Sequence, residues 1–175
     1  AKLAKYQRRL AKKKLGSKNR LKAKRKVARI HAKISDCRLD NLHKLSRKLI
    51  NENQVVCAEN LAVKNMIKNP ILAKHIADAS WGEFTRQLAY KADWAGRTYV
   101  EIGRFFPSTK QSSGCGFVMD SLALAVRLWA CPECKVIHDR DVNAARNILA
   151  AGLAVLAFGE NVSGACISVY SSDSR

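Results

Sequence analysis

Acidic side chains are nearly absent from the first fifty residues of this chain, which carry 19 Lys and Arg but only Asp36 and Asp40. The other 125 residues carry 13 Lys and Arg against 12 Asp and Glu, so the positive excess belongs to one segment. Charge concentrated in this way predicts a polyanionic partner, most simply nucleic acid. A solvated helix pair or a coiled-coil partner site is the alternative, but alternating charge signs would then be expected.

Signals for export and for membrane insertion are also missing. The first residues are highly basic and no apolar core follows them, so we expect no secretory signal peptide. The apolar run 148–158 is eleven residues long and contains Gly152, which predicts that it is too short to span a bilayer. The six cysteines therefore fit a reduced, cytoplasmic setting, with Cys37, Cys57 and Cys166 as core or incidental thiols.

Helical periodicity dominates the basic segment. Residues 1–15 predict a short helix that Gly16 and Ser17 stop. Apolar residues at three- and four-residue intervals predict a longer helix over 19–51. We therefore expect a basic helical hairpin that binds phosphates through Arg8, Arg9, Lys12, Lys13, Lys14, Lys18, Arg20, Lys22, Lys24, Arg25 and Lys26.

Two strands are expected in the remainder. A β-branched run over 54–58 predicts a buried strand with Glu59 at its end, and 98–102 alternates like a second strand.

Two helices accompany these strands. Ser80 and Glu83 have the spacing of a capping box, so we expect a helix that begins there and stops at Gly96. A second helix is predicted over 141–151, closed by Gly152. The intervening stretch 107–126 is loop-like.

A Cys-x-x-Cys pair, Cys131 and Cys134, offers two soft thiolates suited to zinc. Asp141 follows as a hard oxygen ligand where an apolar helical run begins. A thioredoxin-like redox motif is excluded because this pair sits in a loop rather than at the start of a helix. A nucleobase deaminase is excluded because no histidine is followed by Glu in a His-x-Glu motif.

Together with segment 55–66, these motifs resemble the TnpB (OrfB) family of bacterial insertion sequences, small RNA-guided DNA nucleases related to the type V CRISPR effectors. The resemblance covers nearly the whole chain and runs through the basic helices and residues 80–84, 90–96, 105–110 and 148–152. It implies an α/β chain with a partial RNase H-like (RuvC) fold, an inserted basic helical hairpin and a zinc-knuckle module.

The same resemblance implies a division of the chain into five segments. These are the basic hairpin 1–51, a RuvC-like second segment 52–106, the zinc knuckle 107–138, a RuvC-like third segment 139–158 and an unassigned tail 159–175.

RuvC-like sites hydrolyse phosphodiesters with several carboxylates around a pair of Mg²⁺ or Mn²⁺ ions. The resemblance implies that Glu59 fills the second acidic position and Asp141 the third, whereas Asp139 only hydrogen-bonds or caps. Without it, Glu59 would be interpreted as a surface acid at a strand end and Asp141 as a helix N-cap.

The first acid of the family lies on a Gly-x-Asp-x-Gly strand before the hairpin, and no such sequence precedes Ala1. We therefore expect a C-terminal piece or a truncated derivative. It should hold Mg²⁺ or Mn²⁺ fully only with the missing acid, and should cut nothing on its own.

The family binds its structural zinc through two Cys-x-x-Cys pairs. Here the second pair is intact, whereas the first retains Cys115 and has Ser112 in place of the other cysteine. His138 is a candidate to complete the four ligands, in a changed geometry. The alternative is an empty, loosened knuckle with buried thiols.

The leading functional hypothesis is the C-terminal RuvC-like and zinc-knuckle part of a transposon-encoded, RNA-guided DNA endonuclease. Its partners would be guide RNA and DNA in the bacterial cytoplasm, at the nucleoid, with no membrane contact. One alternative is a nuclease-dead, decayed or repurposed relative that only binds RNA or DNA. Another is an interaction protein whose helices pair with a protein partner.

Overall fold

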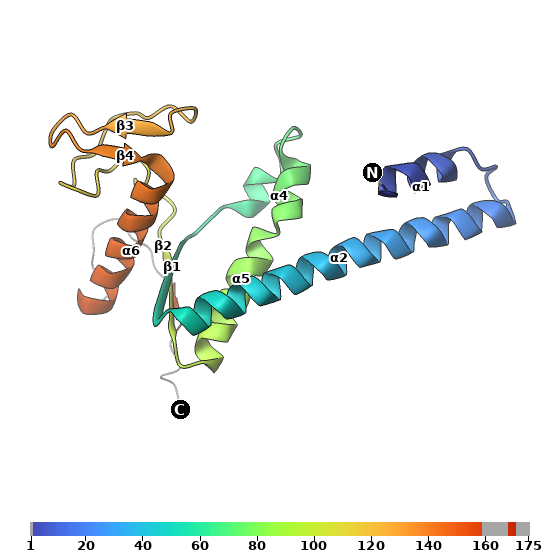
Figure 1. Ribbon diagram of the computed structural model, residues 1–175, viewed down its shortest axis with the longest axis horizontal. Helices are drawn as coiled ribbons and strands as arrows, with labels where there is room; N and C mark the ends of the chain where they lie inside the picture. Colours follow the sequence, from blue (N-terminus) through green and yellow to red (C-terminus); the bar gives the residue numbers. More distant parts are fainter. Residues whose placement is uncertain (1, 159–167, 171–175) are drawn as a thin grey trace. The chain divides into compact units, whose positions relative to one another are not determined.

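The structure, a computed structural model, describes residues 2–158 and 168–170 (Figure 1). The chain forms two compact units, Ala1–Leu45 and Ser46–Arg175. The helix α2 (Lys18–Glu52) begins in the first unit and ends in the second, so its last turns pack with the remainder of the chain. The division into five segments stays a prediction.

The first unit is the helical hairpin that the periodicity predicts. Helix α1 (Lys2–Ala11) ends earlier than residue 15, and α2 matches the predicted bounds to within a residue. Gly16 adopts a positive φ of 75°, a conformation that other residues rarely take, in the turn between the two helices.

Hydrogen bonds fix the turn of this hairpin. The Ser17 hydroxyl accepts a bond from the backbone N–H of Arg20 at 3.1 Å and so caps α2. The Arg20 guanidinium donates to the carbonyls of Leu10 at 3.2 Å and Lys13 at 2.9 Å, which ties the end of α1 to the start of α2.

A mixed sheet forms the centre of the second unit. Strand β1 (Val55–Glu59) runs parallel to β2 (Thr98–Ile102), and β2 pairs antiparallel with β5 (Ser168–Tyr170), in the order β1-β2-β5. Both predicted strands are therefore confirmed, with Glu59 as the last residue of β1. The connection between them contains α3 (Val63–Met66), α4 (Ala73–Ala79) and α5 (Trp81–Trp94).

One face of the sheet is covered by α5 and the last turns of α2. Ile50, Leu88 and Tyr99 form the buried cluster at this face. Val56 and Ala58 of β1 pack against the same cluster. Successive side chains of a strand point to opposite faces, so Cys57 and Glu59 must face the other way.

A buried polar contact accompanies this cluster. The Lys91 ammonium donates to the Ser46 hydroxyl at 2.7 Å, and that hydroxyl donates to Gln87 Oε1 at 3.0 Å. Burial, together with the charge of Arg47, lowers the pKa of Lys91. The end of α2 is therefore joined to α5 by hydrogen bonds as well as by apolar packing.

Helix α6 (Arg140–Phe158) covers the opposite face of the sheet. A Cβ atom placed on Gly152 would lie 2.3 Å from Cys57 Sγ and 3.7 Å from Ile102 Cδ1, so only glycine permits this contact between helix and strand. The prediction that Gly152 ends the helix is wrong: it lies inside α6 because the sheet approaches there.

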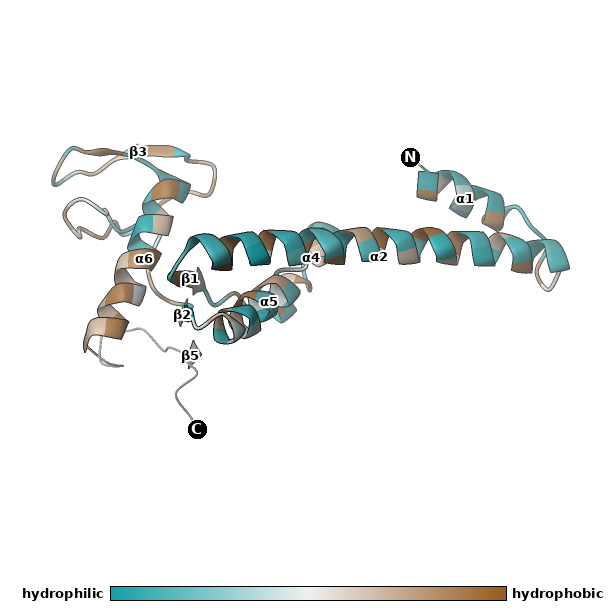
Figure 2. Ribbon diagram, turned by 60° about the horizontal axis from the view of Figure 1, so that its bottom comes forward, coloured by the Kyte–Doolittle hydropathy of each residue, from teal (hydrophilic) through white to brown (hydrophobic). Residues whose placement is uncertain are grey.

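The apolar helix is also longer than the sequence run predicts. Length and composition alone would allow the 19 residues of α6 to cross a membrane, although core helices of soluble proteins pass the same test. Figure 2 colours the lower turns of α6 mostly as hydrophobic residues. Asn143 and Asn147 are buried and hydrogen-bonded to neighbouring loops, so α6 is packed within this unit along one side.

The predicted capping box is wrong in its hydrogen bonds. Ser80 adopts a left-handed conformation with a φ of 52°, and its hydroxyl donates to the carbonyl of Ala77 at 3.1 Å. Glu83 instead accepts from the guanidinium of Arg86 at 2.7 Å. Ser80 is thus the single residue between the end of α4 and the start of α5. The spacing of Ser80 and Glu83 in the sequence does not indicate this.

A two-stranded antiparallel ribbon precedes α6. It consists of β3 (Leu128–Ala130) and β4 (Ile137–Asp139), with the Cys-x-x-Cys pair in the turn between them. The predicted loop over 107–126 is irregular, apart from an isolated bridge between Gln111 and Val118.

Replacing Gly152 should destabilise the second unit, because an alanine methyl group cannot fit against Cys57. We expect Gly152→Ala to lower the free energy of unfolding by about 1–3 kcal/mol, as measured by urea denaturation. Gly82→Ala is the control, since an added Cβ there meets nothing within 4 Å and alanine favours the helix. Equal stability of the two variants would contradict this packing.

Candidate metal centre and nucleic-acid interface

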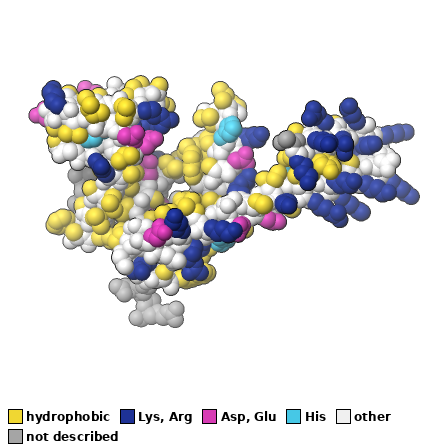
Figure 3. All heavy atoms as spheres, viewed as in Figure 1, with side chains coloured by type: hydrophobic (Ala, Val, Ile, Leu, Met, Phe, Trp, Pro, Cys, Tyr) yellow, Lys and Arg dark blue, Asp and Glu magenta, His cyan; other side chains and the backbone are white. Residues whose placement is uncertain are grey.

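Cations gather densely on the first unit, over α1 and the first half of α2 (Figure 3). No acidic residue occurs before Asp36. Ten of the eleven candidate phosphate ligands are exposed, whereas Arg20 is partly buried and bonded within the hairpin. A groove of about 520 Å³ between the two helices is lined by Tyr6, Arg9, Lys12, Lys13, Asn19, Lys22, Ala23 and Lys26.

Two tight turns in the second unit have the same backbone hydrogen bonds. In the first, the N–H of Ser112 donates to the carbonyl of Phe117 at 2.8 Å. In the second, the N–H of Cys131 donates to the carbonyl of Val136 at 2.9 Å. In both turns, this hydrogen bond joins the first residue of the turn to the sixth.

The fifth residues of the two turns also correspond. The N–H of Gly116 donates to the Ser112 carbonyl, and the N–H of Lys135 donates to the Cys131 carbonyl, both at 2.9 Å. Their φ angles are positive, 80° and 60°. Ser112 therefore occupies the position in the first turn that Cys131 occupies in the second.

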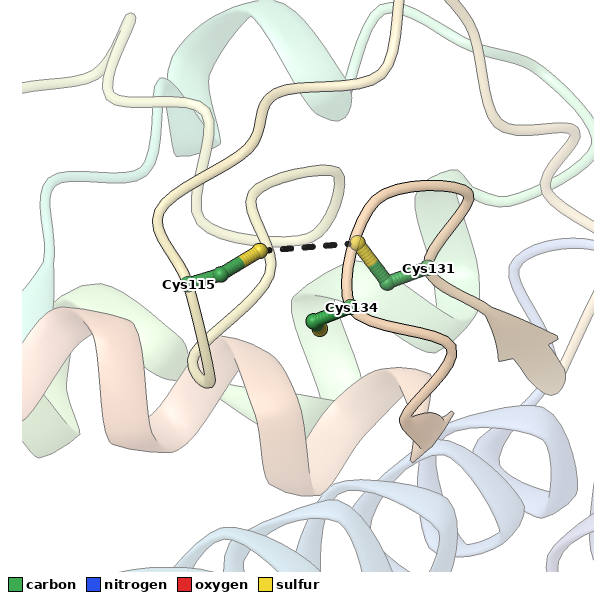
Figure 4. Close-up of side chains that lie close together, drawn as sticks. All are labelled: Cys115, Cys131 and Cys134. Atoms are coloured by element: carbon green, nitrogen blue, oxygen red, sulfur yellow. Dashed lines mark hydrogen bonds between the residues drawn. The ribbon is translucent and has the colours of Figure 1, made fainter.

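The fourth residues of the turns, Cys115 and Cys134, meet Cys131 in one cluster. The three sulfur atoms lie within 4.8 Å of one another. Figure 4 shows Cys115 and Cys131 pointing at each other, with their sulfurs 3.6 Å apart. Among the described residues, this is the only group of three or more Cys, His, Asp or Glu side chains placed to hold a metal ion.

The thiols differ in acidity. Burial alone would raise the pKa of Cys131, but hydrogen bonds from the backbone at Cys134 and Glu133, with the Ser112 and Cys134 side chains, outweigh it and lower the pKa to about 7. For Cys115, the Phe117 backbone and Ser112 lower the pKa, but burial and the neighbouring thiols outweigh them and raise it. Cys131 thus loses its proton more readily than Cys115, which favours it as a thiolate ligand.

His138 lies beside this cluster but not within it. Its Nε2 atom is 2.9 Å from the Ser112 hydroxyl oxygen, and its ring centroid is 4.8 Å from that of Trp129. Both His138 and Ser112 are almost fully buried. His138 contacts the position where the fourth cysteine would be expected, and Ser112 fills that position.

Glu59 lies on the face of the sheet that α6 covers. It is paired in register with Ile102, whose side chain faces α6, and Asp141 is in the first turn of α6. Asn147 of the same helix hydrogen-bonds to Ser108, in the loop that follows β2.

The two carboxylates stand at different distances from the contact between Gly152 and Cys57. Asp141 is roughly 16 Å along the helix from Gly152, whereas Glu59 is about 7 Å along β1 from Cys57. Asp141 instead accepts from Arg127 at 2.9 Å and from Arg140 at 3.3 Å. That Glu59 and Asp141 share a pair of ions therefore stays a prediction.

The environments of the acids differ. Partial burial raises the pKa of Glu59, and a neighbouring cation would lower it again. Asp139 caps α6, as considered from the sequence: its carboxylate accepts from the backbone N–H groups of Asp141 at 3.0 Å and Val142 at 2.9 Å. Asp141 is therefore not the N-cap, and its carboxylate faces arginines.

Sequence reasoning missed two asparagines that hold the first turn against α6. The side chain of Asn147 donates to the carbonyls of Ser108 at 2.8 Å and Gln111 at 2.7 Å. Asn143 donates to the same Gln111 carbonyl at 2.7 Å and accepts from the N–H of Ser113 at 2.8 Å. The sequence signal was two amide side chains four residues apart in an apolar helix. Burying such side chains costs free energy unless they are hydrogen-bonded, so they indicate a bonded partner.

Known protein families match two segments of the chain. Residues 1–70 match the family described as "Probable transposase" (OrfB_IS605), and residues 81–148 match the family described as "Cas12f1-like, TNB domain". A Streptomyces pristinaespiralis protein named an RNA-guided DNA endonuclease is 55% identical over 93% of this chain. Escherichia coli K12 InsQ, also named an RNA-guided DNA endonuclease, is 36% identical over 92% of it. The TnpB-like protein L79 of Acanthamoeba polyphaga mimivirus is 30% identical over 79%.

The chain spans less than half the length of these relatives. It covers 40% of the Streptomyces protein, 44% of InsQ and 27% of the mimivirus protein.

Proposed function

Because the chain belongs to the TnpB (OrfB) family, we propose that it forms the C-terminal RuvC-like and zinc-knuckle part of an RNA-guided DNA endonuclease. The observation that supports this proposal is that Glu59 lies on the face of the sheet that α6 covers, while Asp141 is in the first turn of that helix. Its partners are guide RNA and DNA, which it meets at the nucleoid of a bacterial cell.

Phosphodiester hydrolysis by two metal ions needs more than two acids. Among the described strands, β1 pairs only with β2, so its other edge is open to a further strand. A strand added there with an acid near Glu59 would bring a third carboxylate to the same edge. Asp141 would then exchange Arg127 for a cation shared with Glu59.

The hairpin contributes affinity rather than sequence choice in this proposal. Ten of its eleven candidate phosphate ligands are exposed, and Lys and Arg contact phosphates without reading bases. Guide RNA and guide–target heteroduplex would be held by shape and charge, while base pairing selects the target.

The thiol cluster fits a structural zinc ion. Tetrahedral zinc with Zn–S bonds of about 2.3 Å separates its sulfurs by about 3.8 Å. The observed Cys115–Cys131 separation is 3.6 Å, and all three sulfurs lie within 4.8 Å. Zinc bound there would crosslink the two turns.

The second candidate function is a nuclease-dead relative that binds RNA or DNA. Ser112 in place of a cysteine and the pairing of Asp141 with two arginines favour it. Cleavage of DNA by a longer protein that contains this chain would favour the endonuclease, and binding without cleavage would favour the nuclease-dead relative.

Neutralising cations of the groove should weaken binding to all nucleic-acid sequences alike. Each phosphate contact contributes roughly 0.7–0.9 to the slope of log affinity against log salt concentration. We expect the Arg9→Gln/Lys12→Gln/Lys22→Gln variant to bind RNA more weakly, with a slope smaller by about 2. Filter binding over a salt series measures both quantities.

The matched control removes three charges outside the hairpin, at the exposed residues Lys64, Lys68 and Lys74. It should retain the affinity and slope of the unchanged protein. Equal losses in both variants would show that net charge, rather than the groove, determines binding.

Asp141 should be essential for cutting but not for binding. A longer protein that includes an upstream acidic strand should cleave guide-matched DNA with Mg²⁺ or Mn²⁺, and Asp141→Asn should abolish this cleavage because it removes a metal ligand. Glu133→Gln, which changes an exposed acid of the second turn, is the control and should cut normally. Cleavage by the Asp141→Asn protein at the unchanged rate would rule out the assigned role.

Purified protein should contain about one zinc ion per chain by elemental analysis. Cys131→Ser should lose most of this zinc and melt at a lower temperature, since three thiolates leave no spare ligand. Cys37→Ser, which removes an exposed thiol of α2, should retain both properties. Zinc-free wild-type protein would count against a structural zinc site.

A further inference from the structure

The Ser112 hydroxyl contacts the thiol cluster. Its oxygen is 3.6 Å from Cys134 Sγ. Only 1% of Ser112 is exposed. The serine is therefore buried against the cluster.

These separations match a four-ligand tetrahedron with one oxygen. A zinc ion with Zn–S bonds of about 2.3 Å and a Zn–O bond of about 2.1 Å would set sulfur–oxygen edges of about 3.6 Å. The distance from Ser112 Oγ to Cys134 Sγ is 3.6 Å, the same as the sulfur–sulfur distance between Cys115 and Cys131. The equivalence of the two turns also puts Ser112 at a ligand position.

His138 is placed to act on this oxygen rather than on the ion. Its Nε2 atom is 2.9 Å from Ser112 Oγ, and the ring packs against Trp129. Its ring nitrogens lie outside the group of ligand atoms that are mutually within 4.8 Å. If a ring nitrogen of His138 accepts a hydrogen bond from the hydroxyl, the lone pairs of the serine oxygen remain directed toward the thiols.

We propose that the knuckle binds its metal ion through the thiolates of Cys115, Cys131 and Cys134 and the hydroxyl oxygen of Ser112, with His138 as the residue that positions that hydroxyl. The proposal rests on the metal-binding part of the proposed function. It replaces His138 by Ser112 as the fourth ligand.

An oxygen at the fourth position has a consequence for affinity. Zinc prefers thiolate to a neutral hydroxyl, so this site should hold its ion less tightly than a site with four cysteines. The ion should also exchange faster. The first turn would then depend on the ambient concentration of zinc more than a four-cysteine knuckle does.

Cobalt(II) titration of the full chain tests the ligand set, because its d–d bands report the donor atoms and its charge-transfer absorption reports the number of thiolates. Ser112→Ala should shift the d–d bands and lower affinity about 10-fold or more. Ser112→Cys should raise affinity about 10-fold or more and increase the charge-transfer absorption by about a third, from three thiolates to four. His138→Gln should leave the bands in place and lower affinity by at most about 10-fold.

Two results would overturn the proposal. Bands that shift in His138→Gln and not in Ser112→Ala would make histidine the ligand. Bands unchanged in both would put water at the fourth position. Circular dichroism of each variant shows whether it is folded. The Ser112→Cys variant tests the proposal by a gain in cobalt affinity and charge-transfer absorption, so that test does not depend on a loss.

Binding of RNA separates this inference from the proposed function. Wild-type protein that binds RNA but no cobalt would overturn the metal site and leave the nucleic-acid role standing. Protein that binds cobalt as expected but no RNA would support the ligand assignment and overturn the nucleic-acid role.

Discussion

The contact between Gly152 and Cys57 determines where the chemistry of the second unit lies. Because no side chain separates them, α6 rests directly on β1 and its direction is set by the sheet. Asp141 lies in the first turn of that helix, and Glu59 points to the face of the sheet that the helix covers. The same helix anchors the first turn through Asn143 and Asn147. One close approach thus orders both the carboxylates and the thiols.

The two sets of ligands are chemically distinct, and the structure keeps them apart. Thiols and a hydroxyl gather in the paired turns, whereas carboxylates lie on α6 and β1. Soft sulfur prefers zinc and hard carboxylate oxygen prefers magnesium or manganese, so in the proposed function each ion would be directed to its own site by ligand type. The cations of the hairpin belong to the other unit.

Local patterns predicted what depends on local interactions. The strand 98–102, the long helix beginning near Asn19 and the position of Glu59 at a strand end follow from side-chain periodicity, and the structure confirms them. The end of α6 was mispredicted because glycine usually stops a helix, and only the distant Cys57 explains why it does not here. Ser80 was mispredicted because a capping box and the end of a preceding helix share the same residue types. Whether Glu59 and Asp141 share ions could not be predicted from spacing, because their separation depends on how the part of α6 between Asp141 and Gly152 lies against the sheet.

The matching backbone bonds of the two turns fix the shape of the knuckle backbone. The turn closed by Lys135 keeps a left-handed conformation that is unfavourable for a residue with a side chain, and hydrogen bonds help to hold it there. Such turns place the three sulfurs close together. Capture of an ion by loops fixed in this way would require little loss of chain entropy, so its speed would be governed by the removal of water and protons from the thiols rather than by a search through loop conformations.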